Sequence, residues 1–497
     1  MAIEPIYEVV ALSCNKRLCT AQIAVEANAQ VHSSSIKRIL GVTATVSAEP
    51  TEVFSQEARV SGRVNFGVLY ITEAGETLSL ERSADFSDKI NDAAIEAGKP
   101  YLAIKVVEAK ATEFSAEEIK LLAVLELTLF DSRAQRTKYL ASGGENLYTN
   151  EQTIEYTSLV SAFGDDFIAE TEEDFDCDEL LGYETATVIK NFDSQVDMVR
   201  AGGEFVLRAL GRKNGEIFQK EIVCPYLNEC RADGTRNGNL VDASVCVSSV
   251  ETALEEGRLK VCFRARAHGF VFAKGQASCV TDAFSVACEL KKECQSVKYA
   301  ASKGAFSFTD EIDGSITLGD EMPIADNIVA VTGTTVQIAS AYALEGRVVV
   351  DGVFGANLIY FSSESNTLSS VVAEIPFSLT KSASVCERDE VVASASVARI
   401  KPKVRRGNEL AIRAEISVLV SVCEGRSVEI ITMVTEGEEI SVPTSAISLH
   451  IARQNESLWE IAKALCTTPE LVLVQNPHLE LPLRGGERIV AYRHLKK

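Results

Sequence analysis

One alternating pattern recurs along this chain of 497 residues and limits what the chain can fold into. Between residues 59 and 71, valine, phenylalanine and tyrosine occupy alternate positions together with one glycine. Alternation of β-branched and aromatic residues with polar ones is typical of a strand that buries one face. The pattern returns at residues 350–361 and, more weakly, at residues 199–211. All three copies keep the glycine, and two keep a tyrosine eight positions later: Gly62 and Tyr70, Gly352 and Tyr360, and Gly203 with Gly211 in the tyrosine position.

The repeat extends beyond this strand. An aromatic residue follows it in each copy, within the pairs Asp85-Phe86, Pro225-Tyr226 and Pro376-Phe377. Residues 106–127 then align with residues 246–267 at an offset of 140 (247 − 107), and residues 396–420 supply the third copy. Offsets that agree across separated landmarks indicate repeated units, each long enough to bury a core. We therefore predict a mainly β protein with three repeated β-sandwich-like domains, at residues 1–150, 151–300 (the divergent copy) and 301–443.

Shorter signals complete the prediction for these units. Ala74-Gly75 predicts a turn between two strands of a hairpin. The polar segment 131–140 predicts a short helix or a loop. Residues 165–179 hold nine acids and no Lys or Arg, which indicates a solvated loop or strand edge, with a docking face for a basic partner or a cation site as the alternatives. A calcium loop would need fixed oxygen spacing and a central glycine, and both are missing. Residues 436–443 predict a charged linker.

Composition and charge argue against several classes of protein. The net charge of −22 disfavours a nucleic-acid binder and repels the chain from anionic lipid surfaces. Glu4 and Glu8 stand where a signal peptide carries positive charge, and no apolar segment reaches the length of a membrane span. Thirteen cysteines, mostly isolated and without a CxxC pair, indicate buried thiols in a reducing compartment. We expect a cytoplasmic protein with no membrane insertion, no metal and no cofactor. Whether the cysteines form cross-links is left open.

From residue 447 the spacing of apolar residues becomes helical. Ser457 and Glu460 form a capping box, in which each side chain accepts from a free N–H at the start of a helix. Pro469 opens a second short helix, which Asn476-Pro477 ends, and residues 485–492 return as a strand. The first helix carries apolar residues at i, i+3, i+4 and i+7: Leu458, Ile461, Ala462 and Leu465. The sequence therefore predicts the order strand, helix, helix, strand.

That order and those residues resemble the LysM module. The family pattern is Gly-Asp-Thr-Leu-Trp-x-Ile-Ala, then Asn-Pro at the end of the second helix, then Gly-x-x-Leu before the last strand. The counterparts here run from Asn455 to Ala462, followed by Asn476-Pro477 and by Gly486 to Ile489. Asn455 and Glu456 stand where the family usually has Gly and Asp, in the loop that contacts N-acetylglucosamine in glycan-binding members. The resemblance implies a small βααβ LysM domain at residues 446–497.

Three acidic β units followed by one LysM-like module resemble the SipL and SpoVID group of spore-coat morphogenetic proteins, whose β units are called SPOCS domains. The segments Gly62 to Tyr70 and Gly352 to Tyr360 and the Pro376-Phe377 step match that domain. The resemblance implies a protein of the mother-cell cytosol that attaches the spore coat to the forespore surface. It would do so by binding the coat-basement ATPase, stage IV sporulation protein A, through the LysM region.

The candidate site is a binding site without catalysis. The sequence holds no Walker loop, no GxGxxG opening a helix after a strand, no HExxH and no GxSxG. Trp459 is either an anchor packed between helix and sheet or an exposed aromatic on a binding face. The residues expected to bind a partner or a glycan lie in the LysM loops: Asn455, Glu456, Ser457, Leu458, Trp459, Leu473, Asn476, Pro477 and His478.

Three functions are weighed on these signals. The first is a non-enzymatic scaffold whose LysM-like module docks a protein and whose edge strands offer surfaces for self-association. The second is a cell-wall protein that binds peptidoglycan, and the third is an enzyme with an unrecognised site. Residues 447–497 carry a net charge of +2 (7 − 5), so the remainder carries −24, and this contrast can orient a partner over about 8 Å at physiological salt. The oligomeric state and the interfaces between the β units are left open.

Overall fold

The computed structural model describes residues 3–492 except 32–34, 50, 94, 96–99, 116, 133, 145, 407 and 441–446. It confirms a mainly β protein built from antiparallel sheets, with two helices of seven residues each among the described residues. Neither helix has the length and apolarity needed to cross a bilayer. Gly407 and residues 441–443 of the predicted linker lie outside the described residues, and the linker's first residues, Glu436–Glu439, belong to a strand.

Apart from the strand at residues 135–143, the strands of residues 16–439 form three pairs of sheets. The first pair comprises β2 (Lys16–Gln30), β8 (Glu118–Asp131) and β7 (Tyr101–Ser115), and opposite them β3 (Ile36–Ala48), β5 (Glu57–Thr72), β4 (Glu52–Phe54) and β6 (Thr77–Asn91). The second comprises β10 (Tyr148–Asp174), β15 (Arg258–Phe284) and β14 (Leu240–Glu255), and β11 (Glu179–Gln195), β12 (Met198–Lys213) and β13 (Glu216–Arg231). The third comprises β16 (Cys288–Thr317), β21 (Glu409–Glu439) and β20 (Asp389–Val404), and β17 (Asn327–Leu344), β18 (Arg347–Ser362) and β19 (Thr367–Ser382).

Each pair of sheets encloses its own apolar core. In the second pair, for example, the ring of Phe205 on β12 stacks on that of Phe263 on β15 with centroids 4.9 Å apart. The predicted hairpin is present, because β5 ends at Thr72, β6 begins at Thr77, and Gly75 adopts a φ of 85° between them. Three sandwiches therefore follow one another along the chain.

The repeated glycine and the aromatic residue that follows it are cross-strand partners in every sandwich. Gly62 pairs with Phe86, Gly203 with Tyr226 and Gly352 with Phe377. A Cβ on Gly352 would lie 2.4 Å from the carbonyl oxygen of Gln337 and 2.6 Å from the ring of Phe377, and the other two glycines are similarly enclosed. The aromatic ring covers the glycine, so a methyl group at this position has no space. This requirement explains why the spacing recurs in the sequence.

The second sandwich lacks the repeated tyrosine because another aromatic residue takes its space. A Cβ on Gly211 would meet the rings of Phe175 and Phe218 at 2.9 and 3.0 Å. Phe175 is buried, although it lies within the acidic segment 165–179. The first ten residues of that segment belong to the edge strand β10, and several of their carboxylates pair with Arg or Lys of neighbouring strands. The strand-edge interpretation is therefore confirmed.

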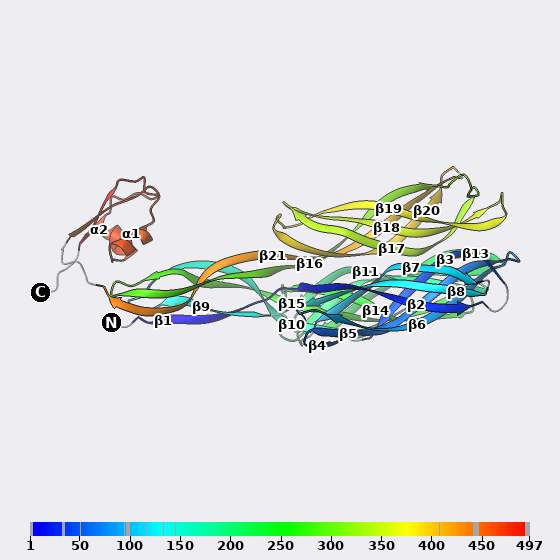
Figure 1. The fold of residues 1–497 in the computed structure, drawn as a ribbon, viewed down its shortest axis with the longest axis horizontal. Helices are drawn as coiled ribbons and strands as arrows, with labels where there is room; N and C mark the ends of the chain where they lie inside the picture. The colour runs from blue at the N-terminus through cyan, green and yellow to red at the C-terminus, as the bar shows by residue number, and fades with distance from the viewer. Residues whose placement is uncertain are drawn as a thin grey trace.

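Three two-stranded ribbons extend from one end of the sandwiches (Figure 1). The first consists of β1 (Pro5–Leu12) and β9 (Gln135–Gly143), and the others are the outer halves of β10 with β15 and of β16 with β21. The prediction of a helix or loop at residues 131–140 is wrong over most of its length, because β9 pairs along β1. Its polar residues gave no strand signal, but Tyr139 and Leu140 are buried among the ribbons.

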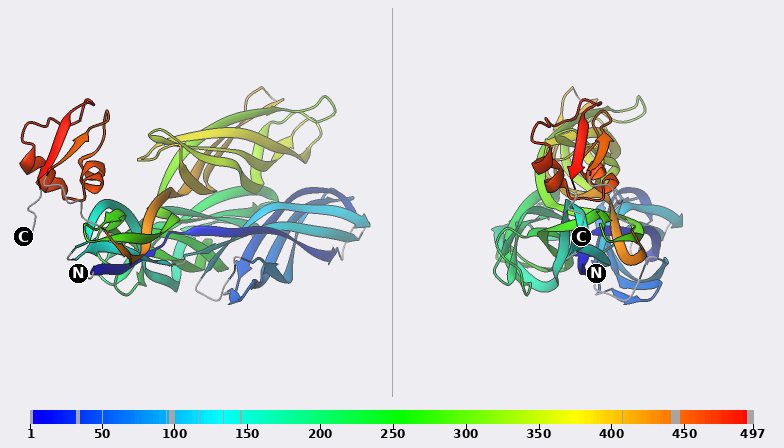
Figure 2. Two further views of the ribbon diagram at one scale, coloured as in Figure 1. Left: turned by 60° about the vertical axis from the view of Figure 1, so that its left-hand side comes forward. Right: turned by 90° about the vertical axis from the view of Figure 1, so that its left-hand side faces the viewer.

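The three copies are arranged around a common centre, which Figure 2 shows end-on. Leu69, Leu210 and Ile359 each lie seven residues beyond their copy of the repeated glycine, and all three belong to one buried cluster. The ribbons repeat this arrangement, because each contributes residues to a second shared core. Each ribbon also has a bulge near its tip, where the pairs Ile6–Ser142, Asn150–Asp282 and Glu293–Met433 occupy the same place. The body thus has internal pseudo-threefold symmetry.

Polar contacts also join the sandwiches. The side-chain amide of Gln219 donates to the carbonyl of Val331 at 2.7 Å and accepts from its N–H at 3.0 Å. At the junction between ribbons and sandwiches, Thr157 Oγ1 donates to the Ser13 carbonyl and accepts from the Ser302 N–H at 2.9 Å. Ser13, Thr157 and Ser302 are all buried. The three repeats therefore share cores and hydrogen bonds and form one fused body.

The last described elements form a small module next to the ribbon tips (Figure 1). Strands β22 (Ile447–Ile451) and β23 (Arg488–Tyr492) pair antiparallel, with helices α1 (Leu458–Ala464) and α2 (Pro469–Gln475) between them in the chain. The element order is the one that the sequence predicts. Ser457 caps α1 with the reciprocal contact from Glu460, and Thr468 caps α2.

Candidate functional site

The loop before α1 is built by internal hydrogen bonds. Glu456 accepts from the Arg453 N–H at 2.7 Å and lies 3.0 Å from His450 Nε2, and these contacts lower the pKa of its carboxyl. Asn455 has a φ of 59°, a left-handed conformation that glycine and asparagine adopt most readily. Asn455 can therefore take the place that the LysM pattern gives to glycine. Asn455 and Ser457 remain exposed to solvent.

The segment after α2 divides into buried and exposed residues. Asn476 is 1% exposed, because its amide accepts from the Val490 N–H and donates to the carbonyls of Val472 and Val490, all at 2.8 Å. This side chain joins α2 to β23 and has no free polar atom to offer a ligand. Leu473, Pro477 and His478 are exposed.

Trp459 makes contacts outside the module. Its Nε1 donates to Asp282 Oδ2 at 2.8 Å, and its ring meets that of Phe284 edge-on with centroids 4.8 Å apart. Asp282 and Phe284 lie at the end of β15, in the second ribbon. Trp459 and Leu458 are half-buried, and both pack against a cluster that contains Phe284 as well as the core of the module. The indole is therefore an anchor between the module and the body, a role that spacing within the module could not reveal.

The outer face of the two-stranded sheet is exposed and mostly apolar, with the charged Arg488 opposite Ile451. Ile447, Leu449 and Ile451 on β22 are 59%, 60% and 62% exposed, and Tyr492, which pairs with Ile447, is 56% exposed. The opposite face carries Ile489 and Ala491, which are buried with the helices. Several large apolar side chains on one uncovered face are typical of a surface that binds another macromolecule.

Sequence reasoning missed this face. The alternation in residues 447–451 was visible, but alternation normally places the apolar side inward. Here Ser448 and His450 take the inward positions, opposite Ala491 and Ile489, and the apolar residues face solvent. A local departure from the usual pattern is a signal of function.

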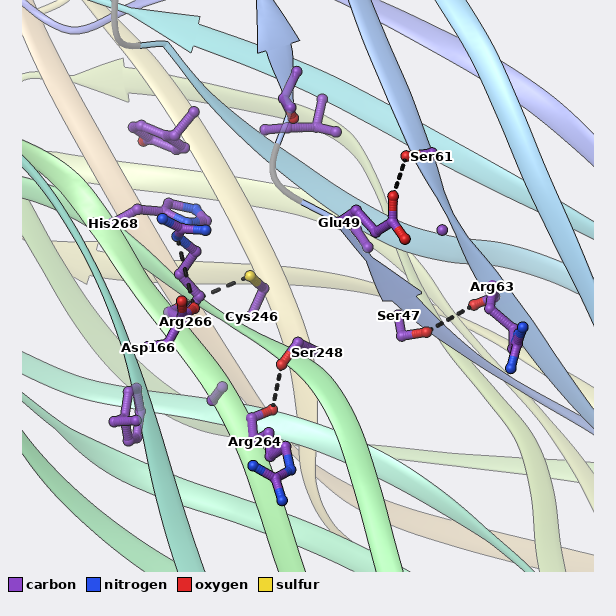
Figure 3. Close-up of a pocket in the computed structure, with 18 of the residues that line it drawn as sticks. Ser47, Glu49, Ser61, Arg63, Asp166, Cys246, Ser248, Arg264, Arg266 and His268 are labelled. Atoms are coloured by element: carbon purple, nitrogen blue, oxygen red, sulfur yellow. Dashed lines mark hydrogen bonds and ion pairs between the residues drawn. The ribbon is translucent and has the colours of Figure 1, made fainter.

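A cleft of about 1150 Å³ separates the first two sandwiches (Figure 3). Arg63 pairs with Asp85 at 2.6 Å, and Arg266 lies 3.9 Å from Asp166. His268 lies deeper, with its ring 4.7 Å from that of Tyr101, and burial lowers its pKa to about 4. The two arginines of these pairs are neutralised by carboxylates of the same cleft, and His268 is uncharged at neutral pH. Each ion pair lies within one sandwich, whereas the ring contact between His268 and Tyr101 joins the two.

Comparisons of the chain with protein-family models, with curated proteins and with solved structures find no match. Within the described part of the chain, no group of three or more His, Cys, Asp or Glu side chains is placed to hold a metal ion. The candidate site is therefore defined by geometry alone. It is a module with one helix anchored to the body and one apolar sheet face exposed.

Proposed function

We propose that this protein is a non-enzymatic scaffold for assembly of the spore coat, with three SPOCS-like units and a C-terminal LysM-like module. The module docks the coat-basement ATPase, stage IV sporulation protein A, at the forespore surface, and the protein works in the mother-cell cytoplasm. The observation that carries the proposal is the exposed apolar face formed by Ile447, Leu449, Ile451 and Tyr492. A surface of this kind suits a protein partner.

The loop geometry favours a protein partner over a glycan. A glycan-binding loop needs free polar groups, whereas the Glu456 carboxylate is engaged by Arg453 and His450 within the module. Asn476 is likewise fully engaged. Binding of peptidoglycan remains the alternative that the experiment has to separate.

The proposal is tested by capture of purified stage IV sporulation protein A on the immobilised full chain. Burial of one leucine or isoleucine side chain contributes about 1.5–3 kcal/mol, so Leu449→Asp or Ile451→Asp should weaken capture at least about tenfold. Val372→Asp is the matched control, because Val372 is 66% exposed on the body. Sedimentation with purified peptidoglycan is measured in parallel.

Equal capture by the wild type and both aspartate variants would contradict the role of the sheet face. Sedimentation of the wild type with peptidoglycan, together with no capture of the ATPase, would replace the proposal by the cell-wall alternative.

A further inference from the structure

The contact between the module and the second ribbon centres on one carboxylate. Asp282 accepts from Trp459 Nε1 at 2.8 Å and from Lys463 Nζ at 2.9 Å, both on α1, and it also pairs with Lys292 of the body. Phe284 is 5% exposed and lies between Trp459 and the ring of Tyr148, whose centroid is 5.3 Å away. An ion pair and an aromatic pair thus hold the same face of α1.

Docking of the module places a second ammonium group, that of Lys463, beside Asp282, which also pairs with Lys292. Burial opposes ionisation of Asp282, but hydrogen bonds from Lys292, Trp459 and Lys463 outweigh it and hold the pKa of the carboxyl well below its usual range. Two of the three donors belong to the module. Release of the module would leave Asp282 with Lys292, which lies on the neighbouring strand β16.

Among the three ribbons, only the second has a carboxylate at the position that contacts the module. The tip bulges place Ser142 and Met433 in the positions that correspond to Asp282. Neither residue carries a charge, so the carboxylate is specific to the second ribbon. Asp282 is therefore not part of the packing that all three repeats share. Its position in the second ribbon alone fixes which ribbon the module contacts.

The contact combines a partly exposed ion pair with an aromatic pair. The Lys463 and Asp282 side chains are 44% and 29% exposed, so solvent and salt screen their attraction. The aromatic pair adds about 0.5–1.5 kcal/mol beyond its buried area. Because the contact forms within one chain, a displacing partner has to compete with a high effective concentration of the module.

We propose that Asp282 and Phe284 form a latch that closes on Trp459 and Lys463 and keeps this face of α1 from partners until one displaces it. This inference rests on the proposed function and adds its regulation. In the latched state the module presents its apolar sheet face, and a partner that also takes the α1 face must open the latch. Opening the latch by mutation therefore raises the affinity for such a partner.

The latch is tested first on the protein alone. Trp459 is the only tryptophan of the chain, so the emission spectrum reports on this contact without labelling. Asp282→Ala and Lys463→Ala should shift the emission to longer wavelength and raise the acrylamide quenching constant about twofold, because the half-buried indole becomes exposed. Asp313→Ala, which removes a carboxylate paired with Arg413 on the body, is the matched control.

Unchanged emission and quenching in both variants would overturn the latch. Lys463→Ala keeps the test decisive even where Asp282→Ala disturbs the ribbon, because Lys463 is on the surface of the module.

The second measurement uses the purified partner from the capture experiment. Asp282→Ala should bind it several-fold more tightly than the wild type, whereas Asp313→Ala should bind like the wild type. Equal or weaker binding by Asp282→Ala refutes the gating. Absence of capture by every form refutes the proposed function and the gating together, and the fluorescence result then still decides whether the contact exists.

Discussion

Asp242 makes the stability of the body depend on pH in a direction that can be measured. It is 2% exposed and lies on β14 near the junction of the three repeats. Burial raises its pKa from an ordinary value of 3.8 to about 6, and hydrogen bonds from Ser421 and Asn15 offset only part of this effect. A carboxyl with a raised pKa in the folded state stabilises the fold fully below the unfolded value, and the contribution is lost as pH rises through the folded value.

The size of the effect follows from the two pKa values. A difference of about 2 corresponds to about 3 kcal/mol at 1.36 kcal/mol for each factor of ten in the proton affinity. Asp242→Asn keeps the shape and cannot titrate. Relative to this variant, the free energy of unfolding of the wild type should therefore rise by about 2 kcal/mol as pH falls from 7.5 to 4, since the unfolded carboxyl is only partly protonated at pH 4.

The comparison with the variant is needed because His268 changes the stability of the fold with pH in the direction opposite to Asp242. Its pKa is lowered to about 4 by burial, so its contribution to stability is lost as pH falls from about 6.5 towards 4. Urea unfolding of both proteins at the two pH values, followed by circular dichroism, cancels the His268 contribution. The free energy of unfolding of the wild type minus that of the variant should increase as pH falls. If this difference stays constant or decreases as pH falls, the assignment of a raised pKa to Asp242 is refuted.

Three further predictions concern the repeats and the module. Gly352→Ala should destabilise the third sandwich by about 1–3 kcal/mol or more, because the new methyl group meets the Gln337 carbonyl, whereas Gly425→Ala, with no atom within 4 Å, should be nearly neutral in the same urea titration. Phe175→Ala should cost about 3–5 kcal/mol by opening a cavity beside Gly211, and thermal unfolding of the variant measures this loss. Asn476→Ala should destabilise the module more than the body, because the Val490 N–H and two carbonyls lose their partners at a cost of about 1–3 kcal/mol each. In a urea titration, Trp459 emission should then change at a lower urea concentration than the circular dichroism of the body. A single transition shared by both signals would contradict this prediction.

The repeat could be predicted from the sequence, but the packing of the three repeats against one another could not. Gly62 and Phe86 were recognisable because a strand pair needs both residues, and this local requirement recurs at fixed spacing. The strand at residues 135–143 gave no such signal, because it is buried by two other ribbons rather than by a partner sheet close in sequence. Long-range packing of this kind leaves no periodic trace.

The same limit applies to the candidate site. Local chemistry was sufficient to predict the α1 cap from Ser457 and Glu460. The role of Trp459 depends on Asp282, which is 177 residues away and has no feature that marks it in the sequence. The outward direction of Leu449 depends on which sheet face the helices cover, and alternation alone does not fix that choice.

The fusion of three repeats into one chain places one C-terminal module beside three similar ribbons. Three identical subunits with this architecture would each carry a module and a contact site for it. Each residue would then be the same in all three copies. In a single polypeptide the residues at equivalent positions can differ, so the position of Asp282 is acidic in the second ribbon and neutral in the other two. The single chain thus combines a near-symmetric body with one module, which contacts the second ribbon through Asp282.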